Sequence, residues 1–319
     1  MNSSDPLLQP FTLKHLTLKN RIISTSHEPA YSEDGLPKTR YRLYHEEKAK
    51  GGLALTMFGG GTLVAPDAAP AYGNLYAGDD RIVPYFRRLA EAVHRHGAAT
   101  MCQITHLGRR TSSYAGHWLP AIAPSPIREP AHRAFPKAME DWDIRRVVRS
   151  YGAAAIRCRD GDLDGIEVEA YGHLFDSFWS PALNHRTDRY GGSLENRMRF
   201  GIEVLQEIRR QVGDDYIVGI RMVFDEMLEG GLAFDEGMKI GEILTNSGLI
   251  DFISVIRGHI DTSAGLADVI PNMGTPGAPH LAFAGEIKRA FDLPVMHAAR
   301  INDVATARYA VREGLLDLV

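Results

Sequence analysis

The sequence is poor in cysteine. Among its 319 residues only Cys102 and Cys158 occur, and neither has a second Cys or a His at metal-ligand spacing. A disulfide scaffold and a cysteine-ligated cluster within this chain are therefore excluded, and we expect no metal site. No apolar run approaches the roughly 18 residues that a membrane span requires. Because residues 1–10 also lack the basic and apolar segments of a secretory signal, we expect a reduced, cytoplasmic protein.

A large excess of one charge is also missing. The chain has 36 Lys and Arg residues against 40 Asp and Glu residues, so its formal net charge is −4. Without a basic field, nucleic acid is not an expected partner. Hydrophobic residues make up 44% and charged residues 24%, which is ordinary for a globular chain that buries enough apolar surface to fold.

Short apolar runs alternate with longer amphipathic stretches along the chain. Most of the short runs are continuously apolar, which is typical of parallel strands buried on both faces. The predicted strands are residues 21–24, 53–58, 99–104, 165–168, 217–222, 252–256, 294–297 and 316–319. The predicted helices are residues 40–50, 81–96, 143–159, 193–212, 235–246, 282–291 and 303–313.

This alternation predicts an α/β fold with a parallel sheet. Eight strands with helices outside favour a TIM (β/α)8 barrel, and no early strand is followed by the G-x-G-x-x-G of an open dinucleotide-binding sheet. We predict one domain over residues 1–319, with a hairpin at residues 10–20 that plugs the bottom of the barrel. No eighth helix follows the eighth strand, so we expect the barrel to be truncated there, without its last helix or further C-terminal domains.

Polar residues gather where the predicted strands end, and barrel enzymes carry their reactive groups at these carboxyl ends. We expect a site at this rim. The rim residues are Ser24–Glu28, Gln103–His106, Glu167–His173, Arg221, Arg257–Asp261 and His297–Arg300.

Four segments resemble the old yellow enzyme-like NADH:flavin oxidoreductase family of FMN barrels. They are Asn20-Arg21, Gln103–Arg109, Arg186–Arg197 and Ala299–Ile301. Within the family, the chain is most similar to the branch of trimethylamine dehydrogenase and 2,4-dienoyl-CoA reductase. Residues 24–36 and 167–173 also resemble N-methylproline demethylases.

The resemblance implies a bound FMN and assigns residues to it. Gln103 would hydrogen-bond the pyrimidine edge of the flavin, and the fixed charge of Arg221 would stabilise the anionic reduced ring. Glu28 stands where trimethylamine dehydrogenase has its flavin-linking Cys, so the FMN is expected to be non-covalent. The ring is expected against the backbone of Thr25, Ser26, His27, Gly59 and Gly60, and the phosphate against Ala298, Ala299 and Arg300.

The substrate side departs from the ene-reductases of the family. Glu169 replaces the first residue of their His pair, and a carboxylate repels an enolate-like oxyanion. His173 takes the place of a Tyr proton donor, and His259 that of a catalytic His in dienoyl-CoA reductases. With Tyr171, these four residues are our predicted catalytic groups. For Glu169 an equally weighted alternative is a buried partner for an Arg.

Three further residues are predicted to contact substrate. Arg257 could clamp a carboxylate or form a salt bridge at its strand end, His106 is expected near the flavin, and Trp179 could face a methylammonium group or pack at the rim. We expect another set of histidines to be solvated on the bottom or on the outer helices, namely His15, His45, His94 and His96.

The predicted function is FMN-dependent oxidation of a small N-methyl amine or N-methyl amino acid, such as N-methylproline, by hydride transfer to flavin N5. The alternatives are NAD(P)H-dependent reduction of enoate or 2,4-dienoyl-CoA double bonds, and a non-catalytic flavin-binding barrel. Relatives in this branch add a 4Fe-4S site and a nucleotide-binding region, for which this chain has no Cys run. An electron-transfer partner or missing C-terminal domains are therefore implied, and a homo-oligomer is compatible with the sequence.

Overall fold

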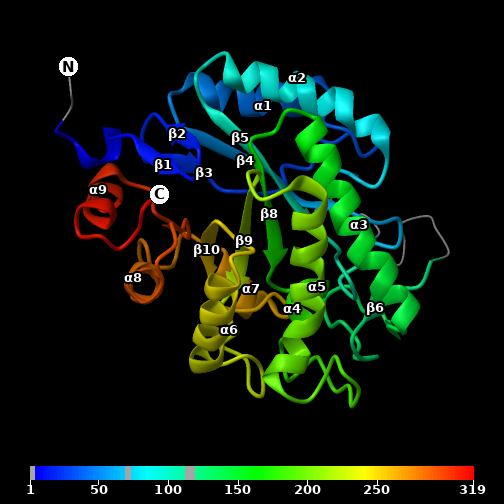
Figure 1. Cartoon of the computed structure of the whole chain (residues 1–319). Coiled ribbons are helices and arrows are strands. Elements are labelled where there is room, and N and C mark those ends of the chain that lie inside the picture. Colours follow the sequence, from blue (N-terminus) through cyan, green and yellow to red (C-terminus); the bar gives the residue numbers. More distant parts are fainter. Residues whose placement is uncertain (1–3, 69–72, 112–118) are drawn as a thin grey trace.

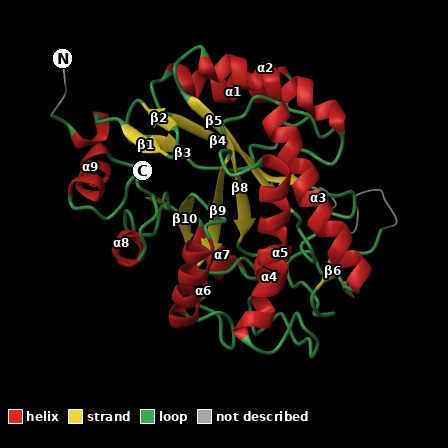
Figure 2. Cartoon of the chain, in the orientation of Figure 1, coloured by secondary structure: helices red, strands yellow, loops and turns green. Residues whose placement is uncertain are grey.

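The computed structural model describes residues 4–68, 73–111 and 119–319, and its strands lie at the centre with helices around them (Figures 1 and 2). The described residues contain a seven-stranded parallel sheet in the order β11-β10-β9-β8-β5-β4-β3. Its strands are β3 (Ile23–Ser24), β4 (Leu55–Leu63), β5 (Ala99–Thr105), β8 (Gly165–Ala170), β9 (Ile217–Val223), β10 (Phe252–Ile256) and β11 (Val295–Met296).

The last residues of the chain join the two edges of this sheet. Leu318 forms a parallel bridge with Met296 of β11. On the other side, the Val319 N–H donates to the Arg21 carbonyl at 3.0 Å, and the Val319 carbonyl accepts from the Ile23 N–H at 2.7 Å. This segment takes the place of the predicted eighth strand, and the sheet closes into the predicted (β/α)8-type barrel.

Amphipathic helices cover the outside of the strands (Figure 2). Their ends follow ordinary capping chemistry: the Ser193 hydroxyl accepts from the Asn196 N–H where one begins, and Gly248, with φ of 66°, ends another in the left-handed region. The helices are α1 (Thr39–Lys50), α2 (Val83–His94), α3 (Asp141–Asp160), α5 (Leu194–Val212), α6 (Phe234–Ser247), α8 (Leu281–Ala290) and α9 (Val304–Arg312).

The barrel interior is apolar at its lower end and polar at its upper end. Below, Leu55, Met101, Ile217 and Phe252 belong to one buried cluster, which also contains Leu13 and Leu18 of the hairpin β1 (Phe11–Leu13) and β2 (Leu16–Leu18). Above, Gln103 of β5 and Ser254 of β10, each two residues beyond a member of this cluster, are buried polar residues, as are Glu167 and Glu169 of β8. This division confines polar chemistry to the carboxyl ends of the strands.

Several short elements in the loops were not predicted. They follow local capping or pairing rather than a long hydrophobic period, so periodicity does not detect them. They are η1 (Pro6–Leu8), η2 (Asp80–Ile82), β6 (Ile122–Ala123), β7 (Lys137–Ala138), α4 (Leu174–Ser177) and α7 (Ser263–Val269).

The prediction that His45 is solvated was wrong. His45 lies on the inner face of α1, has no exposed surface, and its Nδ1 lies 2.9 Å from the Thr56 hydroxyl of β4. Its ring stacks on Tyr41 at 5.2 Å. The hydroxyl and the aromatic neighbour hold the ring in the core, where Nε2 is buried without a hydrogen-bond partner among the described residues, and sequence position alone does not reveal this placement.

Among the described residues, none of the helices is both long and apolar enough to cross a bilayer.

The hairpin's contribution to stability can be tested with Leu13→Ala. Because Leu13 is fully buried against the lower barrel cluster, its truncation is expected to lower the free energy of unfolding by about 2–5 kcal/mol. Urea unfolding followed by circular dichroism measures this. Thr12→Ala, at an exposed position of the same strand, should change it by less than about 0.5 kcal/mol; equal losses in the two variants would show that the hairpin does not seal the core.

Candidate active site

The upper layer of the barrel begins with an amide–carboxyl pair. Gln103 of β5 lies in register with Glu167 of β8, and its Nε2 donates to Glu167 Oε1 at 2.7 Å. Both side chains are buried. Burial raises the pKa of Glu167 to about 7, although the positive charge of Arg221 acts in the opposite direction. The pair fixes the orientation of the Gln103 amide.

Arg221 of β9 is the cation of this layer. It is in register with Glu169 of β8, and its Nη1 donates to the Ser26 carbonyl at 3.0 Å. Its guanidinium carbon lies 5.5 Å from the centre of the Tyr171 ring. Arg221 therefore links the ends of the first, fourth and fifth barrel strands, where the sequence predicted a flavin contact.

The Gly59–Gly61 turn interrupts β4 and approaches the segment after β3. The Gly60 N–H donates to the Ser26 hydroxyl at 2.8 Å, and that hydroxyl donates to the Phe58 carbonyl at 3.1 Å. Gly60 has φ of 45°, and a β-carbon there would lie 2.1 Å from the Glu28 nitrogen. Only glycine permits this approach, which brings the predicted backbone contacts Ser26, Gly59 and Gly60 together.

Thr25 and His27 flank Ser26 but differ in direction. Thr25 is half-buried, and its carbonyl lies 3.2 Å from His27 Nδ1. His27 Nε2 lies 2.8 Å from the Tyr44 hydroxyl of α1, so the ring points toward the helix and its backbone is the part left to face the barrel mouth.

Glu169 and His173 are neighbours at the end of β8. Glu169 Oε2 lies 3.5 Å from His173 Nε2, and both side chains are buried. Burial alone would raise the pKa of Glu169, but His173, the nearby Thr105 hydroxyl and the charge of Arg221 together lower it. A β-carbon on Gly61 would lie 3.0 Å from Glu169 Oε2, so the carboxylate abuts the glycine turn.

A short turn positions His173. The N–H groups of Gly172 and His173 donate to the Asp176 carboxylate at 2.6 and 3.0 Å, at the start of α4. Among the described residues His173 Nδ1 is buried without a hydrogen-bond partner. Tyr171 is half-buried one residue before the turn, and burial raises the pKa of its hydroxyl above the usual value.

Glu28 was not among our predicted catalytic residues, yet it lies beside Glu169. Its Oε1 accepts from the Ala30 N–H at 2.7 Å, and its Oε2 is a buried atom without a partner in the part of the chain that the structure describes. Burial raises the pKa of Glu28 to about 8, and the negative charge of Glu169 adds to the shift. A carboxyl group one residue beyond the predicted ring contacts is the signal that could have identified it.

Further buried polar atoms at this rim lack a hydrogen-bond partner within the described residues. Besides Thr105 Oγ1, Glu167 Oε2 and Glu169 Oε2, they include Gln103 Oε1, Arg221 Nε, His297 Nε2 and Arg300 Nε. Burial lowers the pKa of His297 to about 4, so its ring is neutral near pH 7. An acceptor, two cationic donors and a neutral imidazole suit a ligand with a polar heterocyclic edge and an anionic tail, as FMN has.

The segment after β11 is the predicted phosphate site. Ala299 and Arg300 have φ of 45° and 62°, so two successive non-glycine residues adopt the left-handed region, a form of strain that gathers at functional sites. Arg300 donates from Nη1 to the Asn272 carbonyl and accepts at its own carbonyl from the Ala278 N–H. Ala298 is half-buried beside them.

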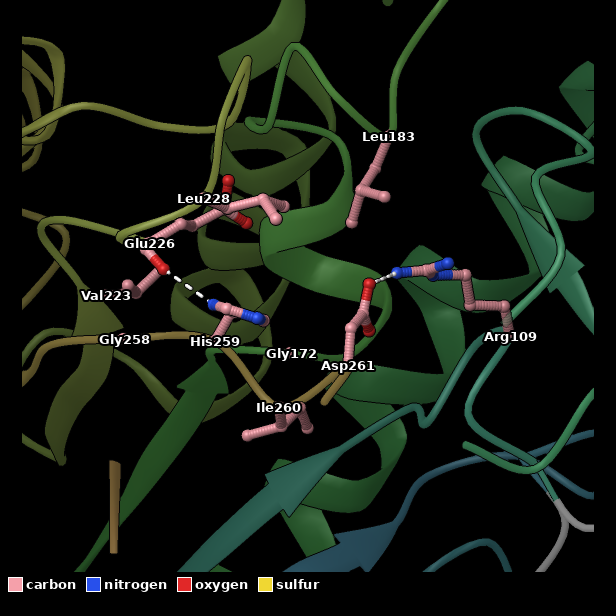
Figure 3. Close-up of a pocket in the computed structure, with 10 residues that line it drawn as sticks. All are labelled: Arg109, Gly172, Leu183, Val223, Glu226, Leu228, Gly258, His259, Ile260 and Asp261. Atoms are coloured by element: carbon pink, nitrogen blue, oxygen red, sulfur yellow. Dashed lines mark hydrogen bonds and ion pairs between the residues drawn. The ribbon is translucent and has the colours of Figure 1, made fainter. Parts of the chain in front are cut away.

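His259 lines a narrow cavity after β10. Its Nδ1 lies 3.0 Å from the Glu226 carbonyl and its Nε2 3.2 Å from the Thr262 hydroxyl. Arg109, Gly172 and Asp261 face the same cavity (Figure 3). His259 therefore lies in the loop after β10 with a partner at each ring nitrogen, and its catalytic role stays a prediction.

Two of the three predicted substrate contacts are engaged elsewhere. His106 is fully buried, its Nε2 is 3.2 Å from Asp67 and its Nδ1 accepts from the Gly108 N–H at 3.0 Å, so it braces the loop after β5. Trp179 is also fully buried, with its ring 5.2 Å from Phe175. These placements contradict the substrate roles predicted for both residues.

Arg257 is bound by an acidic neighbour. Its Nε and Nη2 each lie 3.3 Å from Asp225 Oδ2, and its guanidinium carbon lies 4.7 Å from the centre of the Phe283 ring of α8. This is the strand-end salt bridge of our alternative interpretation, and the carboxylate clamp at Arg257 stays a prediction.

The described residues contain no group of three or more His, Cys, Asp or Glu arranged to hold a metal ion.

A (β/α)8-type barrel with polar groups at the carboxyl ends of its strands is the architecture of a barrel enzyme. The sequence matches the model of the NADH:flavin oxidoreductase / NADH oxidase family over residues 6–319, and the chain belongs to this family, which binds FMN with NAD(P)H as reductant.

Two curated relatives are similar over nearly the whole chain. A probable N-methylproline demethylase of Rhizobium meliloti (strain 1021) is 56% identical over 316 residues, covering 99% of this chain and 47% of the relative. A multifunctional alkene reductase/demethylase of Caballeronia cordobensis is 57% identical over 318 residues, covering 99% and 47%. The chain thus spans about half the length of these relatives.

Among solved structures, a 2-naphthoyl-CoA reductase in complex with 2-naphthoyl-CoA is similar, with a TM-score of 0.92 and 26% identity. The match covers 98% of this chain and 49% of that one.

Glu28 predicts a pH dependence of stability. Because its pKa is about 8 in the folded state against 4.5 ordinarily, the folded state keeps a proton that the unfolded state loses between these values. The free energy of unfolding should therefore fall as pH rises from about 4.5 to 8, and that of the Glu28→Gln variant should fall less over the same range. Chemical unfolding at several pH values measures this, with the exposed Glu242→Gln as control. Parallel curves for Glu28→Gln and the wild type would refute a protonated Glu28.

Proposed function

We propose that this chain forms the FMN-dependent oxidoreductase barrel of an enzyme that removes the N-methyl group of a small N-methyl amine or N-methyl amino acid, such as N-methylproline. The names of the two curated relatives support a demethylase, and one of them also supports an alkene reductase. Bound FMN would supply the acceptor for the hydride that leaves the N-methyl carbon, and hydrolysis of the resulting iminium gives formaldehyde and the demethylated amine.

The observation that carries this proposal is the carboxyl pair Glu28 and Glu169 on the two sides of the Gly60–Gly61 turn. Glu169 carries a negative charge, and the carboxyl group of Glu28, whose Oε2 is buried without a partner among the described residues, lies close to it. An alkylammonium group would find its compensating charge at Glu169. A developing enolate would meet a negative charge instead, which disfavours reduction of simple enones.

The residues that fit FMN are those with unpartnered atoms at the rim. Gln103 and Arg221 would hold the polar edge of the ring, and Arg300 with its left-handed neighbour Ala299 would hold the phosphate. The fixed charge of Arg221 would favour an anionic ring edge.

His173 would take the ammonium proton before oxidation. Its unpartnered Nδ1 can accept that proton, and Glu169 at 3.5 Å from Nε2 would stabilise the imidazolium that results. Asp176 fixes the turn that carries the ring. Tyr171, stacked near Arg221, would limit access of water to the same place.

Reduction of an activated double bond is the second candidate. It is supported by the name of the Caballeronia relative and by the similarity to the naphthoyl-CoA reductase. His173 and His259 would be its proton donors.

Anaerobic mixing of the FMN-loaded protein with substrates separates the two. Loss of the flavin absorbance on addition of N-methylproline, with formaldehyde released, supports demethylation. Reoxidation of the pre-reduced protein by an enone, without any bleaching by N-methylproline, would overturn it.

Glu169→Gln should move the two activities in opposite directions. Removing the carboxylate is expected to slow N-methyl amine oxidation by about 100-fold, because His173 loses its counter-charge, and to speed enone reduction because the oxyanion is no longer repelled. Single-turnover rates of both reactions measure this, with the exposed Glu286→Gln as control. Equal losses in both reactions would refute the electrostatic role of Glu169.

A further inference from the structure

An ion pair spans the loops above the strands on the substrate side. Arg109 follows β5, Asp261 follows β10, and Arg109 Nη2 donates to Asp261 Oδ2 at 2.6 Å. Figure 3 shows the two side chains pointing at each other. A second donor, Arg109 Nη1, is held by the Arg128 carbonyl at 3.2 Å.

The pair lies beside the candidate catalytic groups. Arg109, Asp261, His259 and Gly172 line one cavity of about 10 Å³, roughly one water-sized sphere, which the side chains of Leu183 and others close (Figure 3). Gly172 belongs to the turn that carries His173. The guanidinium of Arg109 therefore reaches the same side of the mouth as the Glu169–His173 pair.

The two partners are not held equally. The Arg109 side chain is 7% exposed and that of Asp261 is 19% exposed. Asp261 is followed by the exposed residues Thr262 and Ser263, whereas Arg109 lies in a loop braced by the buried His106. Asp261 can move outward at lower cost than Arg109.

We propose that Arg109 is the anchor for a substrate carboxylate, and that Asp261 occupies this anchor as an internal carboxylate until substrate displaces it. The substrate class is then an N-methyl α-amino acid, with its carboxylate on Arg109 and its ammonium group toward Glu169 and His173. This identification of the substrate rests on the proposed demethylase function, whereas the anchor itself rests on the ion pair and its cavity.

The neighbouring arginines serve other partners. Arg257 is bound to Asp225 and covered by Phe283. Arg110 donates to the Ile260 carbonyl at 2.5 Å and to Glu129 at 3.3 Å, a carboxylate that is 1% exposed and has no room to leave. Arg109 alone among these three lines the cavity and faces a carboxylate on an exposed loop. The Nη2 donor that holds Asp261 forms a charge-assisted hydrogen bond that a substrate carboxylate can also accept, so one carboxylate can replace another there.

Opposite effects of two substitutions test the anchor. In the FMN-loaded protein, binding of tetrahydrofuran-2-carboxylate, which has a ring and a carboxylate but no oxidisable amine, is measured by calorimetry. Arg109→Lys should weaken this binding by about tenfold, since the shorter side chain no longer places a donor at the position of Nη2. Asp261→Asn should strengthen it, because the internal competitor loses its charge. Arg145→Lys, at an exposed arginine of α3, is the control and should change affinity by less than about twofold.

A purely structural pair predicts a different result, since both substitutions would then loosen the loops and weaken binding together. That outcome overturns the proposal, as does a wild-type protein that does not bind the carboxylate. If Arg109→Lys fails to fold, Asp261→Asn decides alone: tighter binding supports the anchor, and equal or weaker binding overturns it.

Turnover of N-methylproline and N-methylpyrrolidine separates this inference from the proposed function. Arg109→Lys should raise KM for the first, which carries a carboxylate, and leave KM for the second unchanged. If the wild type oxidises neither amine, the demethylase proposal fails. The calorimetric affinities of Arg109→Lys and Asp261→Asn for the carboxylate still test the anchor in that case. If the wild type oxidises both amines and Arg109→Lys raises both KM values equally, the demethylase proposal is supported and the anchor proposal fails.

Discussion

The upper layer of the barrel depends on the charge of Arg221 among buried carboxyl groups. Glu167 and Glu169 lie in the interior, where an unpaired carboxylate is costly, and Arg221 lowers the pKa of both. The same guanidinium holds the Ser26 carbonyl and lies near the Tyr171 ring, so it also fixes the segments that border the mouth. The charge of Arg221 thus acts on the two buried carboxyl groups, and its side chain contacts both the backbone at Ser26 and the ring of Tyr171.

The apolar lower half of the barrel makes this arrangement possible. Leu13 and its neighbours exclude water from below, so charges above act in a poorly screened environment. One end of the resulting site, at Glu28 and Glu169, suits a cation, while Arg109 on the substrate side suits an anion. A zwitterionic N-methyl amino acid complements both, which connects the proposed function with the proposed anchor.

The alternation of apolar runs was sufficient to predict the barrel, because strands buried on both faces have few sequence alternatives. Rim residues such as Gln103 and Arg221 were also predictable, since their positions at strand ends bring them together. Side-chain direction was not: His106 and Trp179 follow the same strand ends yet turn into the core, and Arg257 turns to an acidic neighbour. Glu28 escaped prediction because its role depends on the close approach of Gly60, which only the three-dimensional turn shows.

The reduction potential of the bound FMN, compared between the wild type and Arg221→Met, tests the central claim most directly. A buried cation beside the ring stabilises the anionic reduced form, so the substitution should lower the two-electron potential by at least about 30 mV, equivalent to roughly 1.4 kcal/mol. An unchanged or higher potential in a variant that still binds FMN would show that Arg221 does not govern the flavin.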